Sequence, residues 1–221
     1  MTKAVFFDFD GVLFDTSAGI FASFRQALSE NGLEVPPDSV LHDFIGPPIY
    51  VTMQTYFHLE GERFRKVYRD YRKAYDEANY LLCTPAEGMR ELLEYLKERG
   101  IISAVVSFKA RPMTIKILSA FGMLDLFTGG IGGTEGGGTT SDKSDVARER
   151  LQALGLQGGE VLFVGDRKYD IQAAHACGIK CAAVTWGFGS LEEFRRHGAD
   201  FIVDSPRDIR ALCGTGPDDC I

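Results

Sequence analysis

Short runs of apolar residues alternate along the chain with longer segments whose apolar residues recur at helical spacing. The first run, Ala4 to Phe7, is typical of a strand buried on both faces of a parallel sheet. Similar runs predict strands at 101–106, 161–164, 181–184 and 201–203, with a short extended piece near 127–131. Helical spacing predicts helices at 87–99, 112–121, 143–154, 171–177, 191–197 and 206–212. This alternation indicates an α/β fold with a doubly wound, parallel, Rossmann-like sheet.

The connection between the first two predicted strands is far longer than the dozen or so residues of an ordinary crossover. Within it the sequence predicts a first helix that Thr16 or Ser17 can cap and Asn31-Gly32 ends. Three further helices are predicted near 39–44, 49–57 and 61–80. We interpret residues 15–84 as an inserted helical cap domain over the end of the first strand. The α/β core domain then comprises residues 1–14 and 85–221. The apolar stripe of the last cap helix is interpreted as packing, and it consists of Phe64, Val67, Tyr68, Tyr71 and Tyr75.

Two acidic residues directly follow the first predicted strand. Asp8 lies at its carboxyl end, which is where open α/β sheets bind ligands. Asp10 follows two residues later and faces the same side while the backbone stays extended, so the two carboxylates share one small space. Their repulsion requires relief by a proton or a bound cation. Gly11 allows a sharp backbone turn beside them. A solvated turn explains one such Asp better than it explains the whole Asp-x-Asp-Gly motif.

Polar residues also follow the later predicted strands. Ser107 ends the strand 101–106, where its hydroxyl can bind a phosphate oxygen, although helix capping explains a Ser there equally well. We expect this strand to neighbour the Asp8 strand, which would bring both residues to one crevice. Lys143 begins a predicted helix, an unusual place for a cation because that helix end carries partial positive charge. A nearby anion would remove the oddity, and a solvated surface lysine is the simpler alternative.

Asp166 and Asp170 follow the strand 161–164 in the segment Gly165-Asp166-Arg167-Lys168-Tyr169-Asp170. Capping of the next helix explains one of these two carboxylates. Together with Asp8 and Asp10 they give an oxygen-rich cluster of the kind that the hard cation Mg²⁺ selects. The sequence therefore predicts a Mg²⁺ site at this edge of the sheet.

The segment 129–138 is the one low-complexity patch, with seven glycines in ten residues. Just beyond it, residues 137–144 nearly match the P-loop pattern, but Asp142 stands where that pattern requires its second glycine. No predicted strand immediately precedes this stretch, so we reject an NTPase P-loop. The glycines also lack the spacing of a dinucleotide-binding fingerprint. The role of the patch stays open.

Composition narrows the classes of partner and compartment. With 221 residues and 45% hydrophobic content the chain can bury a full core. The formal net charge of −7 argues against nucleic acid or an anionic membrane as a partner. Apolar runs are too short to span a bilayer and the N-terminus does not resemble a signal peptide, so we expect a cytoplasmic protein. Free thiols are expected for the five cysteines, which are Cys83, Cys177, Cys181, Cys213 and Cys220.

Four segments resemble, in order, the four motifs of the haloacid dehalogenase-like (HAD) phosphohydrolases. The segment from Asp8 to Thr16 resembles the first motif, Ser107 the second, Lys143 the third and the segment 165–170 the fourth. Asp10 favours phosphoryl chemistry, because haloacid dehalogenases proper lack the second Asp. The fourth motif and the later segment 184–189 particularly resemble the phosphoglycolate phosphatase-like group. The sequence departs from this pattern at Phe108, where a small residue is usual, and in the glycine-rich patch.

The resemblance implies a role for each of these residues. Asp8 would be the nucleophile and Asp10 the acid/base. The implied phosphate-binding residues are Ser107, Phe108, Lys109 and Lys143. The implied Mg²⁺ ligands are Asp8 through its side chain, Asp10 through its backbone carbonyl, Asp166, and Asp170 either directly or as a partner of the other ligands.

We therefore expect Mg²⁺-dependent hydrolysis of a small phosphorylated metabolite, a phosphate monoester, through an aspartyl-phosphate intermediate. A sugar-phosphate mutase resembling β-phosphoglucomutase, or a 5′-nucleotidase, would use the same residues. A non-catalytic HAD-fold binding protein would predict a damaged site, whereas the acidic motifs and Lys143 are intact. The substrate and the oligomeric state, monomer or homodimer, stay open. So does the choice among the cap residues that could face the site, which include His42, Tyr50, Gln54 and Arg65.

Overall fold

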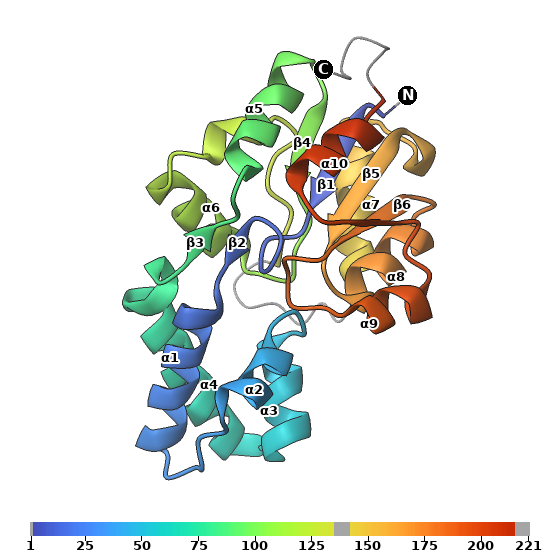
Figure 1. Ribbon diagram of the computed structural model, residues 1–221. Coiled ribbons are helices and arrows are strands. Elements are labelled where there is room, and N and C mark those ends of the chain that lie inside the picture. The colour runs from blue at the N-terminus through green and yellow to red at the C-terminus, as the bar shows by residue number, and fades with distance from the viewer. Residues whose placement is uncertain (1, 135–141, 215–221) are drawn as a thin grey trace.

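The main sheet of the protein has five parallel strands in the order β4-β1-β5-β6-β7 (Figure 1). The structure is a computed structural model that describes residues 2–134 and 142–214. β1 lies between β4 and β5, with Phe7 opposite Val105 and Val164. The strands are β1 Ala4–Phe7, β4 Ile102–Val105, β5 Val161–Gly165, β6 Lys180–Val184 and β7 Phe201–Val203. The expected parallel α/β sheet is confirmed.

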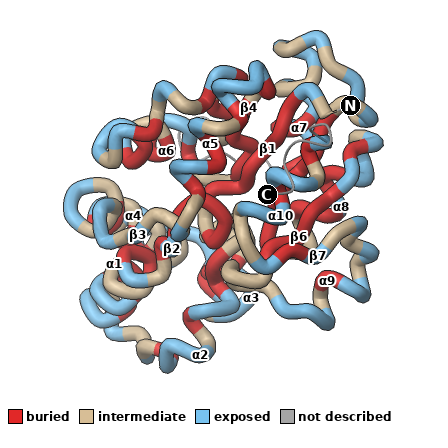
Figure 2. The backbone as a smooth tube through the Cα atoms, turned by 45° about the horizontal axis from the view of Figure 1, so that its top comes forward, coloured by how far each residue is buried: buried red, intermediate tan, exposed pale blue. Residues whose placement is uncertain are grey.

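Helices cover both faces of this sheet because successive residues of its strands point to opposite sides. Val5 and Phe7 of β1 pack in one apolar cluster with α5, α6 and α10, whereas Ala4 and Phe6 pack in a second cluster with α7, α8 and α9. Figure 2 shows the central strands as the most continuously buried part of the chain. The helices are α5 Met89–Glu98, α6 Arg111–Ala120, α7 Lys143–Leu154, α8 Lys168–Ala176, α9 Leu191–His197 and α10 Pro206–Leu212.

The helices α1–α4, which we call the helical group, lie together below the sheet in the view of Figure 1. The chain enters and leaves this group through a two-stranded antiparallel ribbon, β2 Phe14–Asp15 and β3 Thr84–Pro85. Phe24 of α1 packs on Tyr71 of α4, with ring centroids 4.7 Å apart. The helices are α1 Ser17–Glu30, α2 Asp38–Leu41, α3 Ile49–Phe57 and α4 Gly61–Glu77. The ribbon lies at the two ends of the predicted cap, and the division into two domains stays a prediction.

Short 3₁₀ turns replace the ends of several predicted elements. The predicted helix 39–44 consists of α2 and a 3₁₀ turn at His42–Phe44, and the predicted helix 61–80 ends as α4 before a turn at Asn79–Leu81. Further turns lie at Leu124–Leu126 and Gly158–Glu160. α8 begins three residues before the predicted start at residue 171, because its first turn is polar and carries no apolar periodicity.

Part of the glycine-rich patch runs beside β4. The extended piece predicted near 127–131 forms an isolated bridge between Ile131 and Val105. Gly129 N–H donates to the Ser103 carbonyl and Gly132 N–H to the Val105 carbonyl, both at 2.8 Å. A Cβ on Gly132 would lie 2.7 Å from that same carbonyl oxygen, so glycine allows the close backbone approach. Residues 135–141, which include the rest of the patch and much of the P-loop-like stretch, lie outside the described residues.

Two further expectations concern thiols and membrane spans. Cys83, Cys177, Cys181 and Cys213 are free, and Cys220 lies outside the described residues. Across residues 2–134 and 142–214, none of the helices has both the length and the apolar character that a membrane crossing requires.

Candidate active site

The carboxyl ends of adjacent strands bring the predicted site residues together. β4, β1 and β5 are neighbours, and Ser107, Asp8 and Asp166 each follow one of them. Asp8 N–H donates to the Val164 carbonyl at 2.9 Å, so the β1–β5 ladder extends to Asp8 itself. All three side chains are buried, with residue exposures of 2% or less. The expected convergence of these residues in one crevice follows from the strand order.

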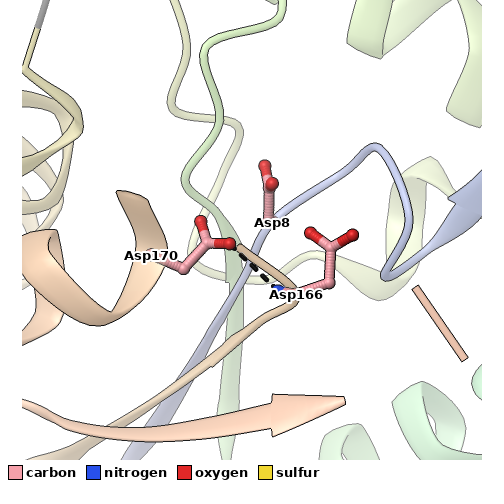
Figure 3. Close-up of side chains that lie close together, drawn as sticks. All are labelled: Asp8, Asp166 and Asp170. Carbon is pink, nitrogen blue, oxygen red and sulfur yellow. Dashed lines mark hydrogen bonds between the residues drawn. The ribbon is translucent and has the colours of Figure 1, made fainter. Parts of the chain in front are cut away.

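Asp8, Asp166 and Asp170 form a buried acid cluster (Figure 3). One carboxylate oxygen of each lies within 4.8 Å of the others. Asp170, in the first turn of α8, accepts hydrogen bonds at Oδ2 from the N–H groups of Asp166 and Arg167, at 3.0 and 2.9 Å. Asp166 Oδ2 accepts from Phe188 N–H at 2.7 Å, whereas its buried Oδ1 has no partner among the described residues.

Lys143 supplies the cation of this cluster. Its Nζ lies 2.9 Å from Asp8 Oδ2 and 2.6 Å from Asp170 Oδ1, and its side chain is 2% exposed. Burial acts to lower the pKa of Lys143, but the attraction of Asp170 and Asp8 outweighs burial and raises the pKa, so the ammonium stays charged at neutral pH. Its position at the start of α7 is explained by the acid cluster that its side chain reaches, whereas a solvated surface lysine was the simpler alternative from the sequence.

One ammonium does not neutralise the three carboxylates of the cluster. Burial raises the pKa of Asp8 to about 6, against the lowering effect of Lys143 and with a further rise from Asp170. Burial also raises the pKa of Asp166 well above its ordinary value, and the charges of Asp170 and Asp8 add to this rise. Burial thus opposes the charged forms of Asp8 and Asp166, and a bound cation would favour them.

The acid cluster fits a hard divalent cation. Its donors are carboxylate oxygens, which Mg²⁺ prefers, and the unpartnered Asp166 Oδ1 is free to bind one. Mg²⁺ keeps several of its waters, so it requires few protein oxygens. The raised pKa of Asp166 marks negative charge that the protein itself does not compensate.

Two glycines allow the backbone to approach Asp166 closely. A Cβ on Gly11 would lie 2.1 Å from Asp166 Oδ2, and Gly11 also has a φ of +85°, which side-chain-bearing residues rarely adopt. A Cβ on Gly187 would lie 2.3 Å from Asp166 Cβ. Because Asp166 is fully buried it has no room to move aside. The segment 184–189, noted in the sequence, thus forms a wall of the acid cluster and supplies the Phe188 N–H.

Asp10 has a different set of partners from Asp8. Its Oδ1 accepts hydrogen bonds from Lys109 Nζ at 2.8 Å and from Thr16 Oγ1 at 2.7 Å. Its Oδ2 accepts none from the residues that the structure describes. Lysine side chains relieve the repulsion between Asp8 and Asp10, because Lys143 and Lys109 each compensate one carboxylate. Burial is the largest cause of the raised pKa of Asp8, and Asp10 contributes least among the causes.

Two contacts made with Asp10 and Lys109 were not predicted from the sequence. Thr16 precedes α1 as expected, but its hydroxyl bonds Asp10 instead of capping the helix, and Asp15 accepts the Ser17 N–H at 2.9 Å. Tyr75 was interpreted as packing, yet its hydroxyl lies 2.8 Å from Lys109 Nζ. A threonine before a helix and a tyrosine on an apolar helical stripe both fit their local positions, so the sequence held no signal for their contacts with distant residues.

A cavity of about 80 Å³ lies between the strand ends and the helical group. Ser107 Oγ accepts the Lys109 N–H at 3.2 Å, and the Phe108 ring lies 5.0 Å from Lys143 Nζ. All the residues predicted to bind phosphate line this cavity. Its core side comprises Asp8, Asp10, Ser107, Phe108, Lys109, Ala110, Thr134 and Lys143. Its helical side includes Ile20, Phe44, Ile45, Tyr50, Tyr68, Tyr71, Arg72 and Tyr75.

The candidate specificity residues of the helical segment fall in different places. Tyr50 lines the cavity, whereas Gln54 is exposed outside it. His42 packs edge-on against Phe188, with ring centroids 5.1 Å apart, and does not line the cavity. Arg65 is exposed and borders a separate surface depression on α4. Arg72, which the sequence did not single out, lines the cavity.

Comparison with known proteins identifies one matching family and several relatives that align with most of this chain. A model of the family described as haloacid dehalogenase-like hydrolase matches residues 5–184. Tyrosine-protein kinase PtkA of Mycobacterium tuberculosis is 34% identical over 190 residues, 86% of this chain, but this chain spans only 64% of the length of PtkA. A 5′-nucleotidase of Pseudomonas aeruginosa is 34% identical over 194 residues, which cover 87% of each protein. Phosphoglycolate phosphatase of Pectobacterium atrosepticum is 30% identical, over 96% of this chain and 92% of that protein.

Solved structures share the whole architecture. A predicted phosphatase from Clostridium acetobutylicum superposes with a TM-score of 0.90 at 29% identity, covering 96% of this chain and 98% of that one. The expected fold class and the resemblance stated from the motifs are both confirmed. The chain belongs to the haloacid dehalogenase-like hydrolase family.

Proposed function

We propose that this protein is a Mg²⁺-dependent phosphatase that hydrolyses a small phosphate monoester through an aspartyl-phosphate intermediate. The observation that carries the proposal is the environment of Asp8. Its Oδ1 accepts the Phe9 N–H at 2.7 Å and its Oδ2 meets Lys143 at 2.9 Å, so the carboxylate has a fixed direction at the wall of the cavity. A carboxylate held in this way beside Ser107 and Lys143 suits in-line attack on phosphorus.

Asp10 is proposed to move the proton in both halves of the reaction. As Asp8 attacks phosphorus, the bond to the leaving alkoxide breaks and Asp10 gives that oxygen its proton. Asp10 then takes a proton from the water that attacks the aspartyl phosphate and releases inorganic phosphate. Because Oδ1 of Asp10 already accepts two hydrogen bonds, Oδ2 is the atom proposed to carry the proton. Lys143 and Ser107 are proposed to stabilise the charge on the transferring group.

We propose Asp8, Asp166 and the backbone carbonyl of Asp10 as the protein ligands of Mg²⁺. When bound, the ion would neutralise negative charge on the phosphoryl oxygens. Both oxygens of Asp170 already accept hydrogen bonds, one from Lys143 and the other from two backbone N–H groups. Asp170 is therefore proposed to orient Lys143 and the turn that carries Asp166.

The segment 15–84 is proposed to act as a mobile cap. Small-molecule pockets usually measure about 300–1,000 Å³, several times the cavity of about 80 Å³ found here. Substrate entry therefore requires the helical group to move away from the strand ends, and the β2–β3 ribbon is the natural hinge because it joins the two parts. Closure would then exclude bulk water from the reacting groups.

The function is tested by phosphate release from phosphoglycolate, sugar phosphates, nucleotides and pyrophosphate, with Mg²⁺ and after its removal by chelation. We expect Mg²⁺-dependent release, fastest with a small alkyl phosphate. A 5′-nucleotidase would prefer nucleoside monophosphates, and the similarity to a protein of that name makes them an essential part of the panel. Isomer formation without phosphate release would indicate a mutase, and the absence of release from every compound would refute the phosphatase proposal.

Mg²⁺ binding is expected to stabilise the folded protein independently of turnover. An ion at one hundred times its dissociation constant adds about 2.7 kcal/mol, because it binds only the folded state. For a chain of this size that corresponds to a Tm increase of roughly 5–11 °C, which differential scanning fluorimetry measures. Asp166→Asn should abolish most of the increase, whereas Asp145→Asn on the exposed face of α7 should retain it. Equal increases in both variants would exclude Asp166 as a ligand.

A further inference from the structure

One side chain of α4 reaches the proposed acid/base residue through a lysine. The Tyr75 hydroxyl lies 2.8 Å from Lys109 Nζ, and Lys109 Nζ lies 2.8 Å from Asp10 Oδ1. Tyr75 is 3% exposed and the Lys109 side chain is 7% exposed, so water competes little for these contacts. Tyr75 belongs to the helical group, whereas Lys109 follows β4 in the core. The chain of contacts therefore crosses the cavity from one part of the protein to the other.

The chemistry of the two groups fixes the direction of their hydrogen bond. An ammonium only donates, so the phenolic oxygen of Tyr75 accepts from Lys109. Aromatic rings further confine the ammonium, because Nζ lies 4.8 Å from the Tyr75 ring centroid and 5.3 Å from that of Phe9. Lys109 is thus held between Tyr75 on one side and Asp10 on the other.

The placement of Lys109 also decides which oxygen of Asp10 is left for the reaction. Lys109 and Thr16 both donate to Oδ1. A lysine side chain has several rotatable bonds, and without a second acceptor its ammonium has no fixed position along the carboxylate. If Lys109 moved to Oδ2, it would oppose protonation of the oxygen that is proposed to exchange the proton. The Tyr75 hydroxyl is the described group that holds Lys109 from the opposite side.

We propose that Tyr75 is a positioning residue that acts through Lys109 on Asp10. By accepting the hydrogen bond from Lys109, it keeps the ammonium on Oδ1 and leaves Oδ2 facing the cavity. Since Tyr75 lies on the helical group, this alignment is complete only when α4 covers the strand ends. The Tyr75 hydroxyl therefore couples two events, the closure of the helical group over the substrate and the alignment of Asp10 as proton donor. The inference rests on the proposed acid/base function of Asp10.

A double-mutant cycle with Tm as the readout tests the contact between Tyr75 and Lys109. Tyr75→Phe keeps the buried ring, which stacks on Tyr71 at 6.1 Å, and removes only the hydroxyl. We expect it to lower Tm by about 2–4 °C, the shift that corresponds to one hydrogen bond in a chain of this size. In a Lys109→Met background the same substitution should have little effect, because the donor is gone. Additive Tm losses in the double variant would overturn the proposal whatever the activity.

A kinetic comparison tests the coupling to Asp10. An alkyl phosphate requires protonation of its leaving oxygen, whereas p-nitrophenyl phosphate releases a stable anion without it. Tyr75→Phe should therefore lower kcat about tenfold for the best alkyl substrate, within the range that general acid catalysis supplies, and much less for the aryl substrate, with KM nearly unchanged. A purely structural role would lower both rates alike. When Lys109→Met is already present, adding Tyr75→Phe should not lower kcat for the alkyl substrate any further.

Tyr56→Phe is the matched control, since it removes the hydroxyl of an exposed α3 residue outside the cavity and should change neither Tm nor either rate. Equal losses of kcat on both substrates, or further loss in the Lys109→Met background, would overturn the positioning role. If the unsubstituted protein releases phosphate from no compound, the proposed function fails instead. The Tm cycle then still decides whether Tyr75 holds Lys109.

Discussion

Asp8→Asn is expected to fold normally and to lose phosphate release, with kcat reduced by at least about 10³-fold. The amide has nearly the shape of the carboxylate but lacks its nucleophilic oxygen, and in the proposed mechanism no other described carboxylate takes its place. Continuous phosphate detection at saturating substrate and Mg²⁺ measures the loss. A variant that keeps a substantial rate would refute the assignment of Asp8 as the nucleophile.

The Tm of Asp8→Asn shows whether a loss of activity comes from the missing nucleophile or from unfolding. The pKa of Asp8 is raised to about 6 in the folded, metal-free protein, mainly by burial. The folded state therefore binds this proton more tightly than the unfolded chain does, and the stability that the bound proton contributes is lost as the pH rises through about 6. An amide has no such proton to lose. At pH 7.5 without metal we expect the Tm of Asp8→Asn to equal or exceed that of the unsubstituted protein, and a large Tm decrease would attribute any lost activity to unfolding.

Lys143→Met is expected to cause the largest loss of stability among the variants considered. The substitution leaves Asp8 and Asp170 buried without their shared cation, and removing one partner of a buried ion pair typically costs about 3–5 kcal/mol. For a chain of this size the Tm should fall by roughly 6–20 °C. Protons can replace the missing ammonium at low pH, so the loss should be greater at pH 8 than at pH 6. Thermal or urea unfolding at the two pH values measures it.

Lys97→Met is the matched control for this prediction. Lys97 lies on the exposed face of α5 and donates to the Asp125 carbonyl at 3.1 Å, a solvent-accessible contact that contributes little. The Tm of Lys97→Met should differ from that of the unsubstituted protein by no more than a few degrees, and this difference should be the same at pH 6 and pH 8. If Lys143→Met behaves like Lys97→Met, the ion pairs of Lys143 do not support the fold.

The residues at the strand ends could be predicted because their positions follow from local patterns and one general rule. An apolar run marks each buried strand, and the residue after it lies at the carboxyl edge of a parallel sheet, where ligands bind. Asp8, Ser107 and Asp166 were found in this way. The resemblance of the motifs then implied that Lys143 binds phosphate at the same site, and in the structure its Nζ lies 2.9 Å from Asp8.

Elements with little local signal were missed for a physical reason. β2 and β3 have two residues each, too few for any periodicity, and their pairing depends on the return of the chain after the helical group. Both oxygens of Asp170 accept hydrogen bonds, and the sequence did not reveal that Lys143, 27 residues away, is one of the donors. Gly187 lies in a segment that the motifs had singled out. The need for glycine there comes from the side chain of Asp166, which is distant in the sequence and leaves no room for a Cβ.

The sequence by itself determined the strands, their ends and the acidic residues placed there, because hydrophobic periodicity and strand burial are local properties of the chain. Only the tertiary structure decided that Thr16 and Tyr75 meet Asp10 and Lys109. A threonine before a helix and a tyrosine on an apolar stripe already satisfy their local roles. Their second contacts depend on how the helical group packs over the sheet, and this geometry is set by the sum of many side-chain contacts and not by the residues near them in sequence.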